Sequence, residues 1–232
     1  MAARARSART IDELIARLER LDRDLPPRDG VRWFNRLYLE VTRAVRDYVH
    51  ERPLRVPGFL ERLDVVFGDA YLAAFDAAAR DDELPRAWAP LFEARHERHV
   101  APLQFALAGM NAHINHDLAV GVVATCQAMD RSPGRAERAD YDAVNAILRE
   151  NEARVKEWLL TGALKELDHA VAPADDVAAI WSITRARDAA WVRAQVLWEL
   201  RGEPLLTRAY LGVNERATEL AGRAMLLPLP VA

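Results

Sequence analysis

Hydrophobic residues recur at intervals of three and four along most of the chain, the spacing of one face of an α-helix. Proline, glycine and charged turns interrupt the pattern. The segments between these breaks predict helices at residues 10–23, 31–50, 58–80, 90–99, 103–128, 175–201 and 205–226, with a further helix that Asp140 caps and that reaches Leu159. Strand-like alternation and solenoid repeats are absent. The sequence therefore predicts an all-α bundle of about seven to eight helices.

The segment 103–128 differs from the other predicted helices because it is hydrophobic around nearly its full circumference. A helix with this pattern belongs in the core, so we expect the other helices to surround it. No shift in composition divides residues 10–228, which predicts a single domain. Residues 1–9 are basic and alanine-rich, and we expect them to be flexible.

Polar residues interrupt the middle of this central helix. At about 100° per residue they form two groups, one of Gln104, Asn111 and Asn115, and an opposite one of His113 and Asp117 with His116 towards its edge. Burying an unpaired amide or imidazole costs about 1–3 kcal/mol, so these groups need partners. Small residues beside the second group, including Gly109 and Gly121, leave room for a closely packed helix or for a ligand.

One hypothesis for this segment is a divalent metal site holding zinc, manganese or iron. His113 and Asp117 are one helical turn apart and can point at one ion. A metal-activated water would then hydrolyse a phosphoester or similar ester. A second metal hypothesis rests on two Glu-x-x-His motifs, as in helical di-iron proteins. These motifs are Glu93 with His96 and Glu166 with His169, and Glu152, Asp64 or Asp117 could complete the site.

A metal-free hypothesis uses the same residues. His113, held by Asp117, could act as a general acid or base on a small molecule, including cyclisation or isomerisation of a specialised metabolite. Asn115 and Arg185 are further catalytic candidates, and the substrate-binding candidates are Asn111, His116, Gln104, Trp181 and Trp191. The site would then lie between the central helix and the 175–201 helix.

The non-catalytic alternative is a ligand-binding or protein-interaction domain. In it, His113, Asp117 and Asn115 would form a buried hydrogen-bond network that fixes helix packing. The partners considered for this network are Arg185, Arg187, Asn35 and tyrosines. A closed network with no cavity beside Gly109 and Gly121 would favour this alternative over an enzyme.

Composition narrows the classes of function further. The net charge of −3 with both signs evenly mixed gives no basic stripe for nucleic acid. Cys126 is the only cysteine, which excludes an internal disulfide, and neither a GxSxG elbow nor a phosphate-binding glycine loop is present. No apolar segment follows the basic N-terminus, so we expect a cytoplasmic protein without membrane association. The alanine-rich amphipathic helices would permit a homodimer.

Two resemblances add expectations. The segments 59–67, 87–93, 104–115 and 181–191 resemble an actinobacterial family of unknown function, and the likeness spans most of the chain. It implies a shared helical fold and no particular activity or cofactor. The pattern from His113 to Leu118 is similar to a helix of zinc-dependent phospholipases C and related nucleases, which implies that His113 and Asp117 ligate zinc. The N-terminal Trp and the additional spaced His ligands of those families have no counterpart here.

Overall fold

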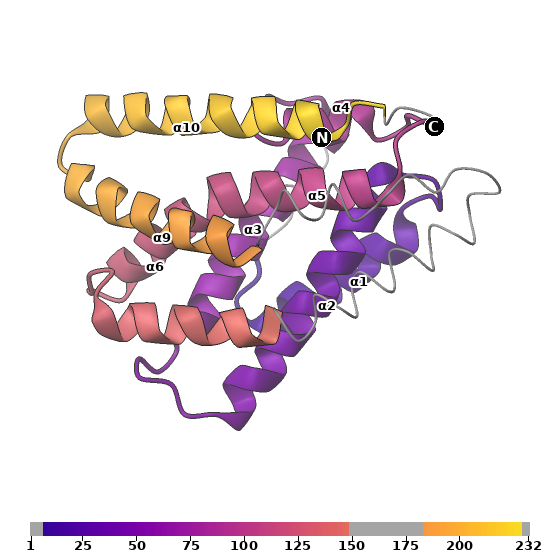
Figure 1. The fold of residues 1–232 in the computed structure, drawn as a ribbon. Helices are drawn as coiled ribbons and strands as arrows, with labels where there is room; N and C mark the ends of the chain where they lie inside the picture. The colour runs from indigo at the N-terminus through magenta and orange to yellow at the C-terminus, as the bar shows by residue number, and fades with distance from the viewer. Residues whose placement is uncertain (1–6, 149–182, 229–232) are drawn as a thin grey trace.

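The computed structural model describes residues 7–148 and 183–228, and every regular element in that part of the chain is helical (Figure 1). The elements are α1 (Ile11–Asp24), α2 (Gly30–Glu51), α3 (Phe59–Arg80), α4 (Ala89–Ala94), α5 (Pro102–Ala112), η1 (His113–Asp117), α6 (Leu118–Ala128), the helical residues 135–148, α9 (Ile183–Leu200) and α10 (Pro204–Met225). The predicted all-α class is confirmed.

The central helix is formed by α5, η1 and α6 in succession. In α5, all residues except Leu103 are buried. The α5 part packs against α2 and α10, whereas α6 packs against α3 and α9. Neighbours thus surround α5 almost completely, whereas α6 leaves Val120 exposed on one side. The predicted central position is confirmed.

The middle of the central helix is a π-helix, η1, which the sequence pattern does not predict. The backbone N–H of Leu118 donates to the carbonyl of His113, five residues earlier, instead of four as in an α-helix. The wider turn coincides with the polar residues between His113 and Asp117. Such π segments are rare and occur frequently at functional sites.

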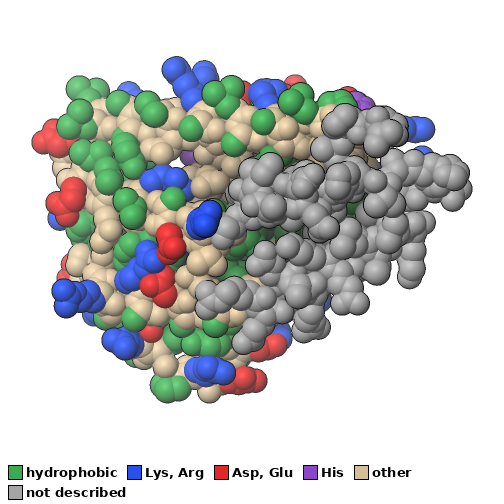
Figure 2. Space-filling view, in the orientation of Figure 1, with side chains coloured by type: hydrophobic (Ala, Val, Ile, Leu, Met, Phe, Trp, Pro, Cys, Tyr) green, Lys and Arg blue, Asp and Glu red, His purple; other side chains and the backbone are tan. Residues whose placement is uncertain are grey.

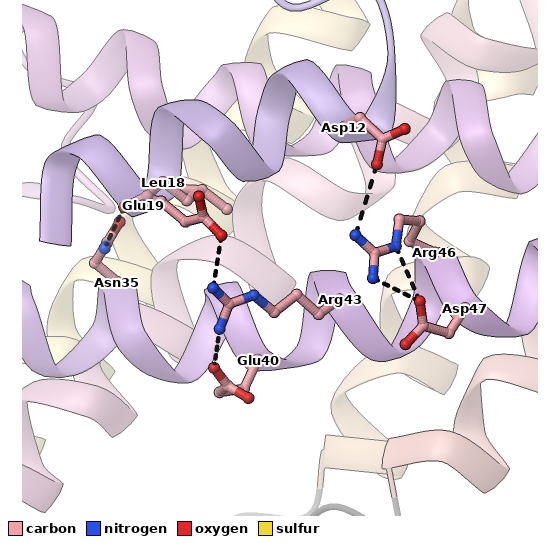
Figure 3. Close-up of polar contacts among 8 residues, drawn as sticks. All are labelled: Asp12, Leu18, Glu19, Asn35, Glu40, Arg43, Arg46 and Asp47. Carbon is pink, nitrogen blue, oxygen red and sulfur yellow. Dashed lines mark hydrogen bonds and ion pairs between the residues drawn. The ribbon is translucent and has the colours of Figure 1, made fainter.

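The seam between α1 and α2 fixes the N-terminal half of the bundle (Figure 3). Inside it, buried Asn35 donates from Nδ2 to the carbonyl of Leu18 at 3.0 Å. At its rim, Arg43 bridges Glu19 at 2.6 Å and Glu40 at 2.5 Å. Exposed ion pairs contribute little to stability, so the buried amide and the packed leucines of α1 hold the two helices together.

Two element boundaries differ from the sequence prediction. The helix expected to begin at Asp140 begins at residue 135. Glu137 stabilises this earlier start by accepting from the N–H of Gly134. Asp140, inside the helix, instead accepts from the backbone N–H groups of Arg55 and Val56 at 2.9 and 2.7 Å and fixes the loop before α3.

The second difference is at α4, expected over 90–99, which ends at Ala94. There the carbonyl of Arg95 accepts from the N–H of Gly30 at 2.7 Å. This bond to the start of α2 takes the place of helical continuation.

Hydrophobic side chains follow the outer surface of α10, at the top of the molecule in Figure 2. The exposed members on this helix are Leu205, Leu206, Val213 and Leu220. No helix in the described ranges has both the length and the hydrophobicity needed to cross a membrane.

Candidate functional site

The two polar groups of the central helix have different surroundings. We call Gln104, Asn111 and Asn115 the amide face, and His113 and Asp117 the imidazole face. The two groups lie on opposite sides of the helix, as predicted: the amide face bonds to α9 and α10, whereas the imidazole face contacts α2 and α3.

The amide face is tied to the protein by direct hydrogen bonds. Gln104 Nε2 donates to the carbonyls of Met225 and Leu227, both at 2.7 Å, and Gln104 Oε1 accepts from the N–H of Ala101. These bonds join the start of α5 to the end of α10, so Gln104, a candidate for substrate binding, has a structural role.

Asn111 and Asn115 continue this network. Asn111 Nδ2 donates to the carbonyl of Thr218 in α10 at 2.8 Å, and Asn111 Oδ1 accepts from Asn115 Nδ2 at 3.1 Å. Asn115 Oδ1 in turn accepts from Arg193 of α9 at 2.8 Å. The structure thus places both predicted site residues in a bonded network between three helices.

The imidazole face begins with a hydrogen-bonded chain of three side chains. His113 Nδ1 lies 3.0 Å from Asp117 Oδ2, and Trp88 Nε1 donates to the same oxygen at 3.1 Å. His116 is farther away, with Nε2 at 3.9 Å from Asp117 Oδ1. Since Asp117 accepts from two directions, it holds the imidazole in one orientation, as a carboxylate orients a catalytic or ligating histidine.

Aromatic rings enclose the imidazole of His113. The Phe67 ring stacks on it with 3.4 Å between centroids, and Tyr38 meets it edge-on at 4.5 Å. Burial in this cluster lowers the pKa of His113 well below its ordinary value. Burial also raises the pKa of Asp117, opposed by the hydrogen bond from Trp88. The imidazole is therefore neutral at neutral pH.

A small cavity adjoins His113. Its volume is about 50 Å³, and its lining is mostly aliphatic, from α2, α3, the central helix, residues 135–148 and α9. The polar members of the lining are Tyr38, Asp64, His113 and Arg187. Seven buried side-chain atoms of the described residues have no hydrogen-bond partner, and three of them, Tyr38 Oη, Asp64 Oδ2 and His113 Nε2, belong to residues that line this cavity. The hydroxyl of Thr42, also among the seven, is a neighbour of Tyr38 Oη.

Three partnerless polar atoms on one cavity require an explanation, because buried polar groups are nearly always bonded. Desolvation raises the pKa of Asp64 to about 7, and the positive charge of Arg187 opposes this rise. Asp64 is partly exposed as a residue although its Oδ2 is buried. Near neutral pH, the cavity thus combines a neutral imidazole, a carboxyl group that readily exchanges a proton, and a guanidinium.

The cavity does not adjoin Gly109 or Gly121, so one of the two conditions expected for a non-catalytic domain is met. The other condition, a closed network, is not met, because His113 Nε2 has no partner. A Cβ on Gly109 would lie 2.3 Å from the Phe34 ring, so α2 occupies that space. A Cβ on Gly121 would lie 3.5 Å from Leu63, an ordinary contact. The small residues admit neighbouring helices, and the free space lies instead beside His113, Ile114 and Leu118.

The site candidates predicted on the 175–201 helix do not line the cavity where they are described, and a different residue of this helix does. Arg185 is exposed and does not line the cavity, whereas Arg187 is buried and does. Trp191 packs against Tyr141 with 5.0 Å between ring centroids and also lies outside the lining. Trp181, Glu152, Glu166 and His169 lie outside the described residues.

The geometry gives little support to a metal site. His113 Nδ1 and Asp117 Oδ2 bond to each other. Glu93 and His96 are exposed, and Glu93 pairs with Arg223 at 2.8 Å. Within residues 7–148 and 183–228, no three His, Cys, Asp or Glu side chains are grouped so that they could hold one ion.

A larger surface cleft of about 780 Å³ lies beside the start of α5 and includes His96. Its buried acid, Asp29, accepts from Val31 N and from Arg95, and the partnerless buried side-chain atoms of the described chain lie elsewhere. The smaller cavity is therefore the better candidate site, despite its size.

Tyr38 was not named as a site residue from the sequence, and Asp64 and Arg187 were considered only for other roles. Tyr38 follows the hydrophobic pattern of its helix and carries no separate signal. Arg187 does carry a signal in the sequence, because it precedes Ala190, Trp191 and Ala194 at helical spacing on the buried face of α9. An arginine on such a face is unusual and needs a partner.

Comparison with known proteins gives a family without an activity. The family model described as "Family of unknown function (DUF5995)" matches residues 11–228. Neither the curated proteins nor the solved structures provide a match. Since the model covers nearly the whole helical bundle and every residue of the candidate site, the chain belongs to the DUF5995 family.

Proposed function

We propose that this protein is an enzyme that transfers a proton within a small organic molecule, with His113 as the general base and Asp64 as the general acid. The observation that carries the proposal is the set of three partnerless buried atoms on one cavity, Tyr38 Oη, Asp64 Oδ2 and His113 Nε2. A substrate in the cavity would supply the missing partners.

The division of roles follows from the surroundings of each group. Asp117 bonds to Nδ1 of His113, which leaves Nε2 as the free basic atom. Burial lowers the pKa of His113, so the imidazole is available as a base at neutral pH. Because the pKa of Asp64 is raised to about 7, its protonated form persists near neutrality and can donate to a substrate oxygen.

The reaction class that fits is abstraction of a proton from a carbon next to a carbonyl group. His113 Nε2 takes the C–H proton while Asp64 gives its proton to the carbonyl oxygen, which forms an enol. His113 then returns a proton to the opposite face of the same carbon, or to the γ-carbon when the enol is part of a conjugated diene, while Asp64 takes back the enol O–H proton. The result is a racemisation or a double-bond isomerisation, and both groups regain their starting protonation states. This chemistry uses residues that line the cavity and needs no further ligand.

The test is deuterium incorporation into small carbonyl compounds in D₂O, followed by proton NMR. The wild-type protein should exchange the acidic C–H of at least one compound, and the His113→Gln variant should lose about 100-fold or more of the rate. His99→Gln, which changes an exposed histidine, is the matched control and should keep the full rate.

The pH profile of exchange gives a second readout. The rate should fall as pH rises above about 7, because Asp64 then loses the proton that it donates. Exchange that survives in His113→Gln, or no exchange in the wild type across the panel, would remove the enzymatic proposal.

A second candidate, a non-catalytic ligand carrier, is favoured by the mostly aliphatic lining of the cavity. It predicts a ligand that stabilises the protein but is recovered unchanged after incubation.

A further inference from the structure

Arg187 is the arginine of the described residues whose side chain is buried, with 7% of its surface exposed. Its guanidinium lies over the Tyr141 ring at 4.1 Å. Nε donates to Asn145 Oδ1 and Nη2 to the carbonyl of Tyr141, both at 2.7 Å. Tyr141 also donates its hydroxyl to the carbonyl of Arg187 at 2.8 Å. This platform fixes the guanidinium in one position, and all of its partners are neutral.

A buried cation normally has an anion beside it. Three more exposed arginines follow this rule, as shown by the pairs Arg17 with Asp69 at 2.9 Å, Arg36 with Asp22 at 2.7 Å and Arg95 with Asp29 at 2.5 Å. Arg193, partly buried on α9, bonds to the amide of Asn115 and pairs with no carboxylate of the described residues. Arg187 forms no ion pair with a carboxylate of residues 7–148 or 183–228. Two acids act on Arg187 by charge without forming an ion pair with it: Asp142, which pairs with Arg138, and Asp64, which lines the same cavity.

The free part of the guanidinium faces the candidate site. Arg187 lines the cavity, and its Nη1 donates to no described residue. Since one water needs about 10–15 Å³ of such space, a volume of about 50 Å³ holds about three to five non-hydrogen atoms. The space thus fits a carboxylate with one or two further carbons, or the carboxylate end of a longer molecule.

The chemistry of the lining favours a carboxylate over other anions. A guanidinium matches the two oxygens of a carboxylate geometrically. One cation would leave half the charge of a phosphate dianion uncompensated in an aliphatic cavity. A protonated Asp64 can instead donate a hydrogen bond to a carboxylate oxygen, as paired carboxyl groups do.

We propose that Arg187 binds the carboxylate of a small organic acid in the cavity beside His113. This inference deepens the proposed function, because it rests on the same cavity and assigns the substrate to the class of carboxylic acids. The acid supplies the ion-pair partner that no carboxylate of residues 7–148 and 183–228 gives to Arg187, and the aliphatic lining contacts its carbon chain.

The test measures thermal unfolding with sodium acetate and sodium propionate, against acetamide and propionamide and against sodium chloride at equal ionic strength. The amides have nearly the shape of the acids without the charge. The acids should raise Tm saturably, by about 3–6 °C at ten times Kd. The amides and chloride should leave it unchanged.

Two variants locate the effect. Arg187→Met should abolish the stabilisation by the acids. Because that change also removes bonds to Asn145 and Tyr141, a second variant leaves Arg187 intact and fills the cavity from α2, namely Val41→Phe. It should also abolish the effect. Arg201→Met, at an exposed arginine, is the control and should respond as the wild type does.

Any of three results overturns the proposal: the acids and amides raise Tm equally, the acids raise it no more than chloride does, or the acids stabilise Val41→Phe as fully as the wild type. The two proposals fail separately. Carboxylates that bind without deuterium exchange would leave the Arg187 site intact and remove the enzymatic function. If the protein exchanges neutral carbonyl compounds and shows no preference for acids, the enzymatic function stands and the Arg187 carboxylate site is removed.

Discussion

The two sides of one helix show two different uses of buried polar groups. On the amide face, the Asn111 side chain both donates and accepts, and its partners belong to the protein. On the imidazole face, His113 has one nitrogen bonded and the other without a partner. The network of the amide face fixes helix packing, although Nε of its member Arg193 has no partner, whereas an unpaired group beside a cavity indicates a ligand. The buried polar residues of both faces look alike by burial, so their hydrogen-bond partners are needed to distinguish the amide face from the imidazole face.

The largest loss in the free energy of unfolding should follow removal of an amide side chain from the amide face. Asn111→Ala leaves the carbonyl of Thr218 and the amide of Asn115 without their partner, so the free energy of unfolding should fall by about 2–3 kcal/mol. Urea denaturation measures it. Asn214→Ala, which loses a bond only within α10, is the matched control and should change by about 0.5 kcal/mol or less. Equal losses in the two variants would show that the amide face does not hold the helices together.

A smaller, pH-dependent effect should come from Asp64. Its pKa is about 7 in the folded protein and about 4 when unfolded, so the folded state keeps the proton to higher pH. The contribution of this group to stability is therefore present below about pH 4 and is lost as pH rises to about 7.

Asp64→Asn should remove this dependence. Between pH 5 and pH 8, the wild type should lose roughly 2 kcal/mol more than the variant, after allowance for the partial exposure of Asp64. Urea denaturation at both pH values gives the difference. Glu61→Gln, an exposed acid on the same helix, should follow the wild type. If the free energy of unfolding changes with pH by the same amount in Asp64→Asn and in the wild type, the pKa of Asp64 is not raised in the folded protein.

The smallest effect on stability should come from His113. His113→Phe keeps an aromatic ring against Phe67 and removes the partnerless Nε2. It also removes the bond from Nδ1 to Asp117, which keeps its bond from Trp88. The free energy of unfolding should change by less than about 1 kcal/mol. If chemical denaturation instead gives a loss as large as that of Asn111→Ala, the imidazole face is structural, and the contrast between the faces disappears.

The opposite placement of the two polar groups could be predicted from the sequence because it depends only on the angle between residues of one helix. The pairing of His113 with Asp117 followed from the same spacing. The sequence could not show that Tyr38, Asp64 and Arg187 meet at His113, since they come from three other helices whose rotation about their axes is set by packing. Choosing Arg185 instead of Arg187 illustrates this limit, because neighbouring turns of a helix offer several polar residues.

The π-helix η1 has a consequence for the comparison of family members. Its bond from Leu118 to the carbonyl of His113 spans one residue more than an α-helical bond, as if a single codon had been inserted into a regular helix. A relative with one residue fewer between positions 113 and 117 would continue as an unbroken α-helix and keep the packing of α5 and α6. It would place the histidine and the aspartate three residues apart and so change the geometry of the bond between them. In an alignment, a one-residue gap in this segment would therefore mark members that keep the fold with a rearranged imidazole face.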